Sequence, residues 1–222
     1  GGRGGAAEAK GSGAEGDFWE AVSRLFGYMK GPLGGYLLVT LLCSFELMGA
    51  HSLMNIYITD AFPSCGPRCL GNLTIARAVV IAVSSGVLLA LSIKWLGDSR
   101  TLWIALAATG AHCLVLVWAK EVWVLYANLA LSAVAYFRVS VLPGFISSSV
   151  PPDLVGFALG AANFLRMVDS VLAPVLFARM FIVYADEPAS LQLPGLPWVV
   201  GAGFVFASMV ALALVPAGGA GE

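Results

Sequence analysis

Two ionisable side chains, Glu46 and His51, interrupt an apolar run over residues 34–58. A carboxyl group and an imidazole can each take up and release a proton, and an imidazole does so close to physiological pH. The spacing between them corresponds to about 140° around a helix, so they point in different directions, and His51 shares its face with Ser44 and Asn55. The sequence predicts proton coupling at Glu46 and His51. The alternative is that each is a buried group hydrogen-bonded to a neighbour.

A second polar group lies in the apolar run over residues 154–183, where Asn163, Arg166 and Asp169 recur at every third position. This spacing places them on one side of a helix and brings Arg166 and Asp169 close enough to pair. Asn163 and Arg166 are therefore candidate solute contacts, and Asp169 is a candidate proton carrier. The alternative is an internally neutralised pair that only orients the helix.

Arg138 lies close to the end of a third apolar run, over residues 121–142. A guanidinium at this position can bind an anionic solute, because it offers five N–H donors in a fixed fork. Its long side chain can instead extend to the membrane surface. The sequence leaves both roles open.

The segment after the first apolar run contains Cys65 and Cys69, and Asn72 follows shortly after them. Asn72-Leu73-Thr74 matches the acceptor pattern for N-glycosylation. In an oxidising compartment the two cysteines are expected to form a disulfide, with free thiols as the alternative. A metal site would need two further ligands, and none is nearby.

Motifs of catalysis do not stand out in this sequence. It contains no Gly-x-Ser-x-Gly pattern, no phosphate-binding glycine loop and no cluster of metal-ligating residues. We therefore expect neither an enzyme nor a bound cofactor.

The composition indicates that these candidate residues sit in a membrane. Hydrophobic residues make up 59% of the 222 residues, and Asp, Glu, Lys and Arg make up only 11%. Soluble domains carry about 25% charged residues, and a chain of this size cannot hide so much apolar surface in one core. The net charge of -1 argues against nucleic acid as a partner, because phosphate binding needs clustered Lys and Arg.

Six apolar runs are each about long enough to cross a hydrocarbon core about 30 Å thick, and helices are the expected form. They cover residues 34–58, 73–96, 101–119, 121–142, 154–183 and 197–215. The sequence thus predicts an all-α membrane protein with a six-helix domain over 34–215. A disordered Gly/Ala-rich tail over 1–16, an amphipathic interfacial helix over 17–31 that Asp17 caps, and a short tail over 216–222 are expected around it.

The distribution of Lys and Arg predicts the orientation. An even number of crossings puts both ends on one side, and the side richer in Lys and Arg faces the cytoplasm. That side receives Arg24, Lys30, Lys94, Arg100 and Arg138, and the other receives Arg68, Arg77 and Lys120. The Asn72 sequon falls in a loop on the opposite, outer side. We expect a multi-pass protein of the plasma membrane or of endolysosomal membranes with both ends cytoplasmic.

Small residues recur along three of the runs and predict close packing between helices of the bundle. They are Ala78, Ala82, Gly86 and Ala90 in the second run, Gly156 and Gly160 in the fifth, and Gly203, Ala207 and Ala211 in the sixth.

The loop Gly97-Asp98-Ser99-Arg100 is similar to the Gly/Asp/Arg loop found at this place in each half of major facilitator transporters. More closely, the order of features resembles the family of the proton-coupled folate transporter, solute carrier family 46. Three further stretches carry the likeness, over residues 49–65 (GAHSLMNIY to PSC), 146–156 (ISSSVPPDLVG) and 193–203 (LPGLP to GAG). The likeness covers about residues 25–215.

This resemblance implies the second half of a twelve-helix transporter, which moves a small organic anion together with protons. The partners would then be the lipid bilayer, the solute, and either a missing N-terminal six-helix half or a second copy. Three family residues are replaced here: the coupling histidine falls on Leu47, an arginine on Pro143 and a lysine on Ser148. The alternative is a truncated membrane protein that does not transport and regulates a full-length relative.

Overall fold

The computed structural model describes residues 9–186 and 195–215, and every element in this part of the chain is a helix. The helices are α1 (Ala9–Tyr28), α2 (Pro32–Ala61), α3 (Pro67–Val83), η1 (Ser84–Leu88), α4 (Leu89–Trp118), α5 (Val122–Ala135), α6 (Phe137–Ser148), α7 (Val155–Asp186) and α8 (Leu196–Ala213). The prediction of an all-α protein is therefore confirmed.

Four helical stretches of the described part are long and apolar enough to cross a membrane. They are Pro32–Ala61, Pro67–Trp118, Val122–Ser148 and Leu196–Ala213. The protein is thus suited to a membrane, as its composition predicts.

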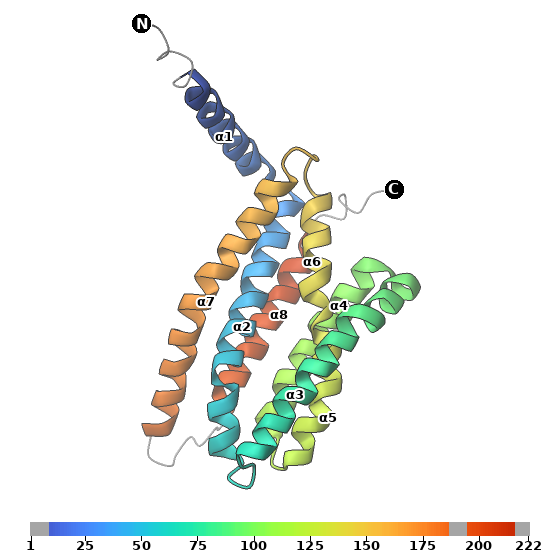
Figure 1. Cartoon of the computed structure of the whole chain (residues 1–222), viewed down its shortest axis with the longest axis vertical. Helices are drawn as coiled ribbons and strands as arrows, with labels where there is room; N and C mark the ends of the chain where they lie inside the picture. Colours follow the sequence, from blue (N-terminus) through green and yellow to red (C-terminus); the bar gives the residue numbers. More distant parts are fainter. Residues whose placement is uncertain (1–8, 187–194, 216–222) are drawn as a thin grey trace, which may run out of the picture.

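The 52-residue stretch Pro67–Trp118 folds back on itself at Gly97. In Figure 1 the chain rises along α3 and descends again along the later part of α4. Gly97 has φ 77° and ψ 166°, a conformation that only glycine adopts without strain. The hydroxyls of Ser92 and Thr101 lie 3.1 Å apart across this bend and join the two arms. The loop Gly97–Arg100 of the sequence is therefore a reversal within a continuous helical stretch.

Proline sets the start of several helices. Pro32, Pro67 and Pro197 each lie in the first turn, where the missing N–H has no helical partner to lose. The break before Val155 also follows the predicted proline-rich turn. By contrast, the fourth apolar run does not end at 142, because α6 continues through Pro143 to Ser148.

Helix α1 begins at Ala9, earlier than the predicted cap at Asp17, so the prediction of disorder is wrong for residues 9–16. This stretch mixes helix-favouring Ala, Lys and Glu with three glycines that disfavour helix, and it contains no proline to stop the helix. Residues 1–8 and 216–222, predicted to be tails, lie outside the described residues. Figure 1 shows α1 projecting from one end of the bundle, where Arg24 pairs with Asp153 at 3.0 Å.

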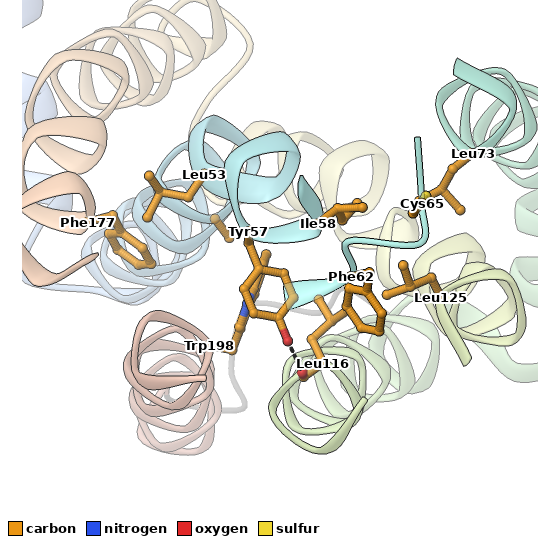
Figure 2. Close-up of a cluster of buried hydrophobic side chains, with 11 residues drawn as sticks. Leu53, Tyr57, Ile58, Phe62, Cys65, Leu73, Leu116, Leu125, Phe177 and Trp198 are labelled. Atoms are coloured by element: carbon orange, nitrogen blue, oxygen red, sulfur yellow. Dashed lines mark hydrogen bonds between the residues drawn. The ribbon is translucent and has the colours of Figure 1, made fainter. Parts of the chain in front are cut away.

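The centre of the bundle is α2, which packs mainly against α7 and α8. Gly49 allows this approach, because a Cβ added there would lie 2.3 Å from the ring of Phe177. Near the far end of α2, the Tyr57 hydroxyl donates to the Leu116 carbonyl at 2.7 Å, and its ring meets Trp198 edge-on (Figure 2). These contacts fix α2 against α4 and α8.

The small-residue stripes do not supply the predicted packing within the chain. A Cβ added at Gly86, Gly156, Gly160 or Gly203 would meet nothing within 4 Å. The prediction is wrong at these positions, since their helices turn the stripes outwards from the bundle.

Candidate functional site

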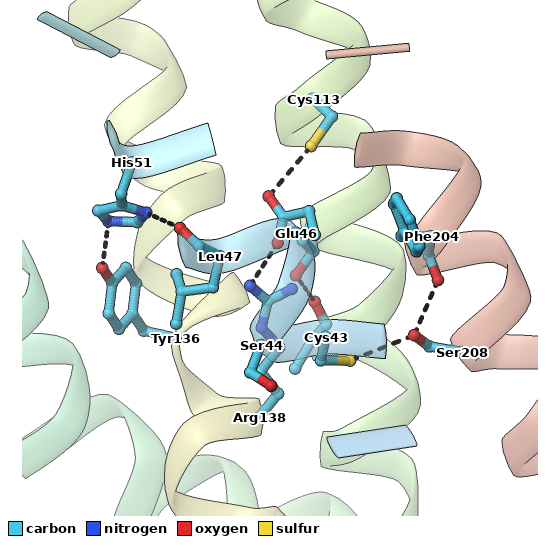
Figure 3. A network of polar contacts seen from close by, with 12 residues as sticks. Cys43, Ser44, Glu46, Leu47, His51, Cys113, Tyr136, Arg138, Phe204 and Ser208 are labelled. Carbon is cyan, nitrogen blue, oxygen red and sulfur yellow. Dashed lines mark hydrogen bonds and ion pairs between the residues drawn. The ribbon is translucent and has the colours of Figure 1, made fainter. Parts of the chain in front are cut away.

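A buried ion pair joins the middle of α2 to the start of α6. The Arg138 Nη2 lies 2.7 Å from the Glu46 Oε2, and both side chains are 4% exposed. The Cys113 thiol donates to the other carboxylate oxygen at 3.5 Å (Figure 3). The prediction that Arg138 can extend to the membrane surface is wrong, because Glu46 holds it inside the bundle.

His51 contacts three neighbours, Leu47, Arg77 and Tyr136. Its Nδ1 lies 2.8 Å from the Leu47 carbonyl oxygen, and its Nε2 lies 2.7 Å from the Tyr136 hydroxyl and also contacts the Arg77 guanidinium. Because the carbonyl can only accept, Nδ1 carries the proton, and Nε2 accepts from Tyr136 and Arg77. His51 is thus a neutral acceptor in this arrangement. Figure 3 draws its contacts with Leu47 and Tyr136.

Asp169 pairs with α2 and not with Arg166. It is 1% exposed and accepts a hydrogen bond from the Ser44 hydroxyl. The predicted ion pair between Arg166 and Asp169 is absent, since the ion pairs among the side chains of residues 19–182 and 195–215 are Arg24–Asp153 and Glu46–Arg138. The spacing allowed the contact, but the crossing of α7 over α2 turns the Asp169 carboxylate towards Ser44.

The rest of the α7 stripe is more open. Asn163 is exposed, and Arg166 is half-buried. Arg166 reaches a pocket of about 100 Å³ between α2, α6 and α7, which we call the two-arginine pocket because Arg138 also lines it. Its lining is completed by Thr40, Cys43, Ser44, Leu47, Met48, Val139 and Leu142.

Arg138, which lines this pocket, keeps donor capacity that Glu46 does not use. Its Nη1 is buried and finds no hydrogen-bond partner among the described residues, although Nη2 is bound by Glu46. An unpaired buried donor costs about 1–3 kcal/mol, more when charged. A water molecule or an anionic group that reached Nη1 would remove that cost.

The structure places the two remaining predicted sites at the opposite end of the bundle from α1. Cys65 and Cys69 form a disulfide in the turn between α2 and α3. Asn72 is exposed, but it lies within α3 and not in a loop, so this part of the prediction is wrong. The helix begins at Pro67 because proline favours the first turn.

Two residues of the site were missed. Arg77 was counted as a charge of the outer side, yet it lies inside α3 and contacts His51. The signal was available, because a charge within an apolar run is a candidate by default. Tyr136 carried no such signal, since its role depends on the break between α5 and α6 at that residue.

Among the described residues, no group of three or more His, Cys, Asp or Glu side chains lies close enough together to hold a metal ion.

Comparison with known proteins finds no family model that matches this chain, and neither a curated protein nor a solved structure matches it.

Proposed function

We propose that this protein forms one wall of a membrane transporter for a small organic anion, driven by protons. The observation that supports this proposal best is the two-arginine pocket, in which Arg138 and Arg166 approach a space flanked by buried carboxylates. Ionisable groups are costly at membrane depth and are retained there mostly for solute or ion pathways. The residues proposed to contact the solute are Arg166, Arg138 and Asn163.

The charges around the pocket explain how a proton can promote anion binding. Arg138 is neutralised by Glu46, and Arg166 is balanced only by Asp169, which lies one helical turn away without pairing with it. When Asp169 takes up a proton, the pocket gains one net positive charge. An anion then binds in a region of low dielectric, where each charge counts more than in water.

The contacts of Ser44 suit both protonation states of Asp169. The Ser44 hydroxyl can donate either to Asp169 or to the Thr40 carbonyl oxygen, which lies 2.7 Å away. An ionised Asp169 accepts a hydrogen bond from the Ser44 hydroxyl. A protonated Asp169 donates to the Ser44 oxygen, whose own proton then turns to Thr40. Of the three predicted proton groups, we therefore assign the carrier role to Asp169, with Glu46 holding Arg138 and His51 holding Arg77.

The six-crossing topology is part of the same proposal. The stretch Pro67–Trp118 supplies two crossings if its arms on either side of Gly97 each span the membrane, and α7, with 32 residues, supplies another. Exposed polar side chains on α2 and α7, such as Asn55 and Asn163, need water or protein beside them at that depth. A second six-helix unit would provide the opposite wall, as the resemblance to major facilitator transporters implies.

The test is uptake of labelled mono- and dicarboxylates by cells that express the intact transporter, at inwardly directed pH gradients of increasing size. Arg166→Gln should reduce uptake about tenfold or more, because it removes a charged hydrogen bond to the solute. Asp169→Asn should retain exchange of solute but lose the dependence on the pH gradient. The matched control is Arg179→Gln, an exposed arginine of the same helix. Wild-type uptake and pH dependence in both variants would refute the proposal.

A second function is favoured by the outward-facing glycines on η1, α7 and α8. A six-helix product could use such faces to bind a full-length relative and regulate it without transporting. The mass of the native protein, measured with an antibody to the C-terminal tail before and after glycosidase treatment, separates the two. A band about twice the size of this chain supports the transporter, whereas a band near 23.1 kDa favours the regulator.

A further inference from the structure

A larger cavity, of about 350 Å³, lies between α2, α3, α4 and α5, near the end of the bundle that carries the disulfide. We call it the Arg77 cavity. Its polar lining consists of His51, Asn55, Thr74, Arg77, His112, Asn128, Ser132 and Tyr136. Its apolar lining consists of Met54, Ile58, Leu70, Leu73, Ala78, Ile81, Leu116, Leu125 and Leu129. A volume of this size falls within the range of small-molecule sites.

The charge of the cavity is positive and unbalanced. Among the described residues, Arg77 is the one permanently charged side chain that lines it, and none of the lining residues is Asp or Glu. Arg77 is oriented by His51, which is a neutral acceptor and so adds no charge. A half-buried guanidinium without a carboxylate favours an anion, which it can bind through paired N–H donors.

The opposite part of the lining suits the apolar part of an organic molecule that also carries a hydrogen-bond donor. Leucine and isoleucine side chains from α2, α3 and α5 make most of the wall. Asn128 is 3% exposed and donates to the His112 carbonyl at 3.3 Å, while its own Oδ1 finds no partner among the described residues. That oxygen is a spare acceptor at the edge of an apolar space, and small molecules bind best where such groups are few and fixed.

The Arg77 cavity and the two-arginine pocket are different places. The first is bounded by α2 to α5 and the second by α2, α6 and α7, and the two share no lining residue. A narrow space of about 20 Å³, lined by residues that include His51, Tyr136 and Glu46, lies next to both. It is large enough for about one water molecule and too small for an organic solute.

We propose that the Arg77 cavity binds an organic monocarboxylate whose apolar part is about the size of an aromatic ring system. The carboxylate pairs with the Arg77 guanidinium, the apolar part packs against the leucine and isoleucine side chains, and a polar substituent contacts Asn128. The residues proposed to bind the anion, the apolar group and the polar substituent all belong to this one chain. The cavity therefore binds its ligand whether or not this chain transports anything.

The experiment titrates the purified full chain in detergent micelles with 2-naphthoate, followed by isothermal titration calorimetry. The neutral isostere 2-naphthamide reports partition into micelles and purely apolar binding. Arg77→Gln should raise the Kd for 2-naphthoate by about tenfold to a hundredfold, because a charged hydrogen bond is lost. The Kd for 2-naphthamide should change little. Arg179→Gln is the matched control and should bind as the wild type does.

A second variant keeps the test decisive if Arg77→Gln does not fold. Thr74→Phe fills the cavity from α3 and retains the charge, and among the described residues Thr74 donates to the Leu70 carbonyl of its own helix. The variant should weaken 2-naphthoate by about tenfold or more. Because Thr74 also completes the Asn72 sequon, wild type and variants are compared after glycosidase treatment.

Unchanged affinity in Thr74→Phe, or in a folded Arg77→Gln protein, would overturn the proposal. If Arg166→Gln alone weakens 2-naphthoate, the anion binds in the two-arginine pocket; the Arg77 proposal then fails and the proposed transport site stands. If Arg77→Gln loses binding while Arg166→Gln and Asp169→Asn keep both the uptake and the pH dependence of the wild type, the Arg77 proposal stands and the proposed transport site fails.

Discussion

Replacement of Glu46 by Gln should strongly destabilise the protein. Gln keeps the shape of the side chain, but it leaves the Arg138 guanidinium, 4% exposed, without a counter-charge. Arginine cannot escape by losing its proton. Removing one partner of a buried ion pair typically costs about 3–5 kcal/mol. For a chain of this size each kcal/mol lowers Tm by about 2–4 °C, so Glu46→Gln should lower Tm by about 6–20 °C.

Thermal unfolding in detergent micelles, followed by tryptophan fluorescence, measures this effect, and the buried Trp198 lies close to the pair. The protein contains its own control in the Arg24–Asp153 pair, whose side chains are 48% and 55% exposed. Water screens that pair, so Asp153→Asn should cost less than about 1 kcal/mol. The difference between the two variants isolates the effect of burial.

The double variant Glu46→Gln/Arg138→Gln completes the test. It removes both charges, and neutral replacements of buried pairs are often close to neutral in stability. It should therefore recover most of the stability lost in Glu46→Gln. Two results would show that this pair is not a dry, interdependent pair. One is a Tm of Glu46→Gln equal to that of the wild type; the other is a Tm of the double variant no higher than that of Glu46→Gln.

Two further predictions concern backbone positions and use the same unfolding assay. Gly49→Ala should destabilise the protein by about 1–3 kcal/mol, because the added methyl meets the buried ring of Phe177. Gly160 faces open space, so Gly160→Ala should be neutral or should stabilise the protein by up to about 1 kcal/mol. Equal effects at these two glycines would contradict the packing of α2 against α7. Gly97→Ala should also cost about 1–3 kcal/mol, since alanine is strained at φ 77°; an unchanged Tm would mean that the chain does not reverse there.

The sequence predicted the helical class and the membrane character well, because both depend on local properties. Long apolar runs bounded by Gly-Pro pairs require helices in a membrane, and α2 begins at Pro32, close to the predicted start at 34. By contrast, α3 begins at Pro67, six residues before the predicted run over 73–96. Boundaries were less certain where no strong breaker occurs. Helix α1 starts at Ala9 because nothing between Ala9 and Asp17 forbids a helix.

The site residues were identified by type, but their partners were not. Glu46, His51, Arg138, Arg166 and Asp169 stand out as ionisable groups in apolar runs, so composition alone finds them. Helical spacing suggested the pair Arg166 and Asp169, and that pair does not form. Spacing shows which side chains share a face, and it carries no information on what the neighbouring helix presents to that face.

What the sequence by itself determined is therefore the set of helices and the set of charges that they bring into the membrane. Only the tertiary structure decided that Glu46 meets Arg138, 92 positions away, and that Ser44 meets Asp169, 125 positions away. The physical reason is that helix formation follows from local hydrogen bonds and hydropathy, whereas partners across the bundle follow from how closely helices approach. Here that approach is set by contacts such as Gly49 against Phe177, which no local pattern encodes.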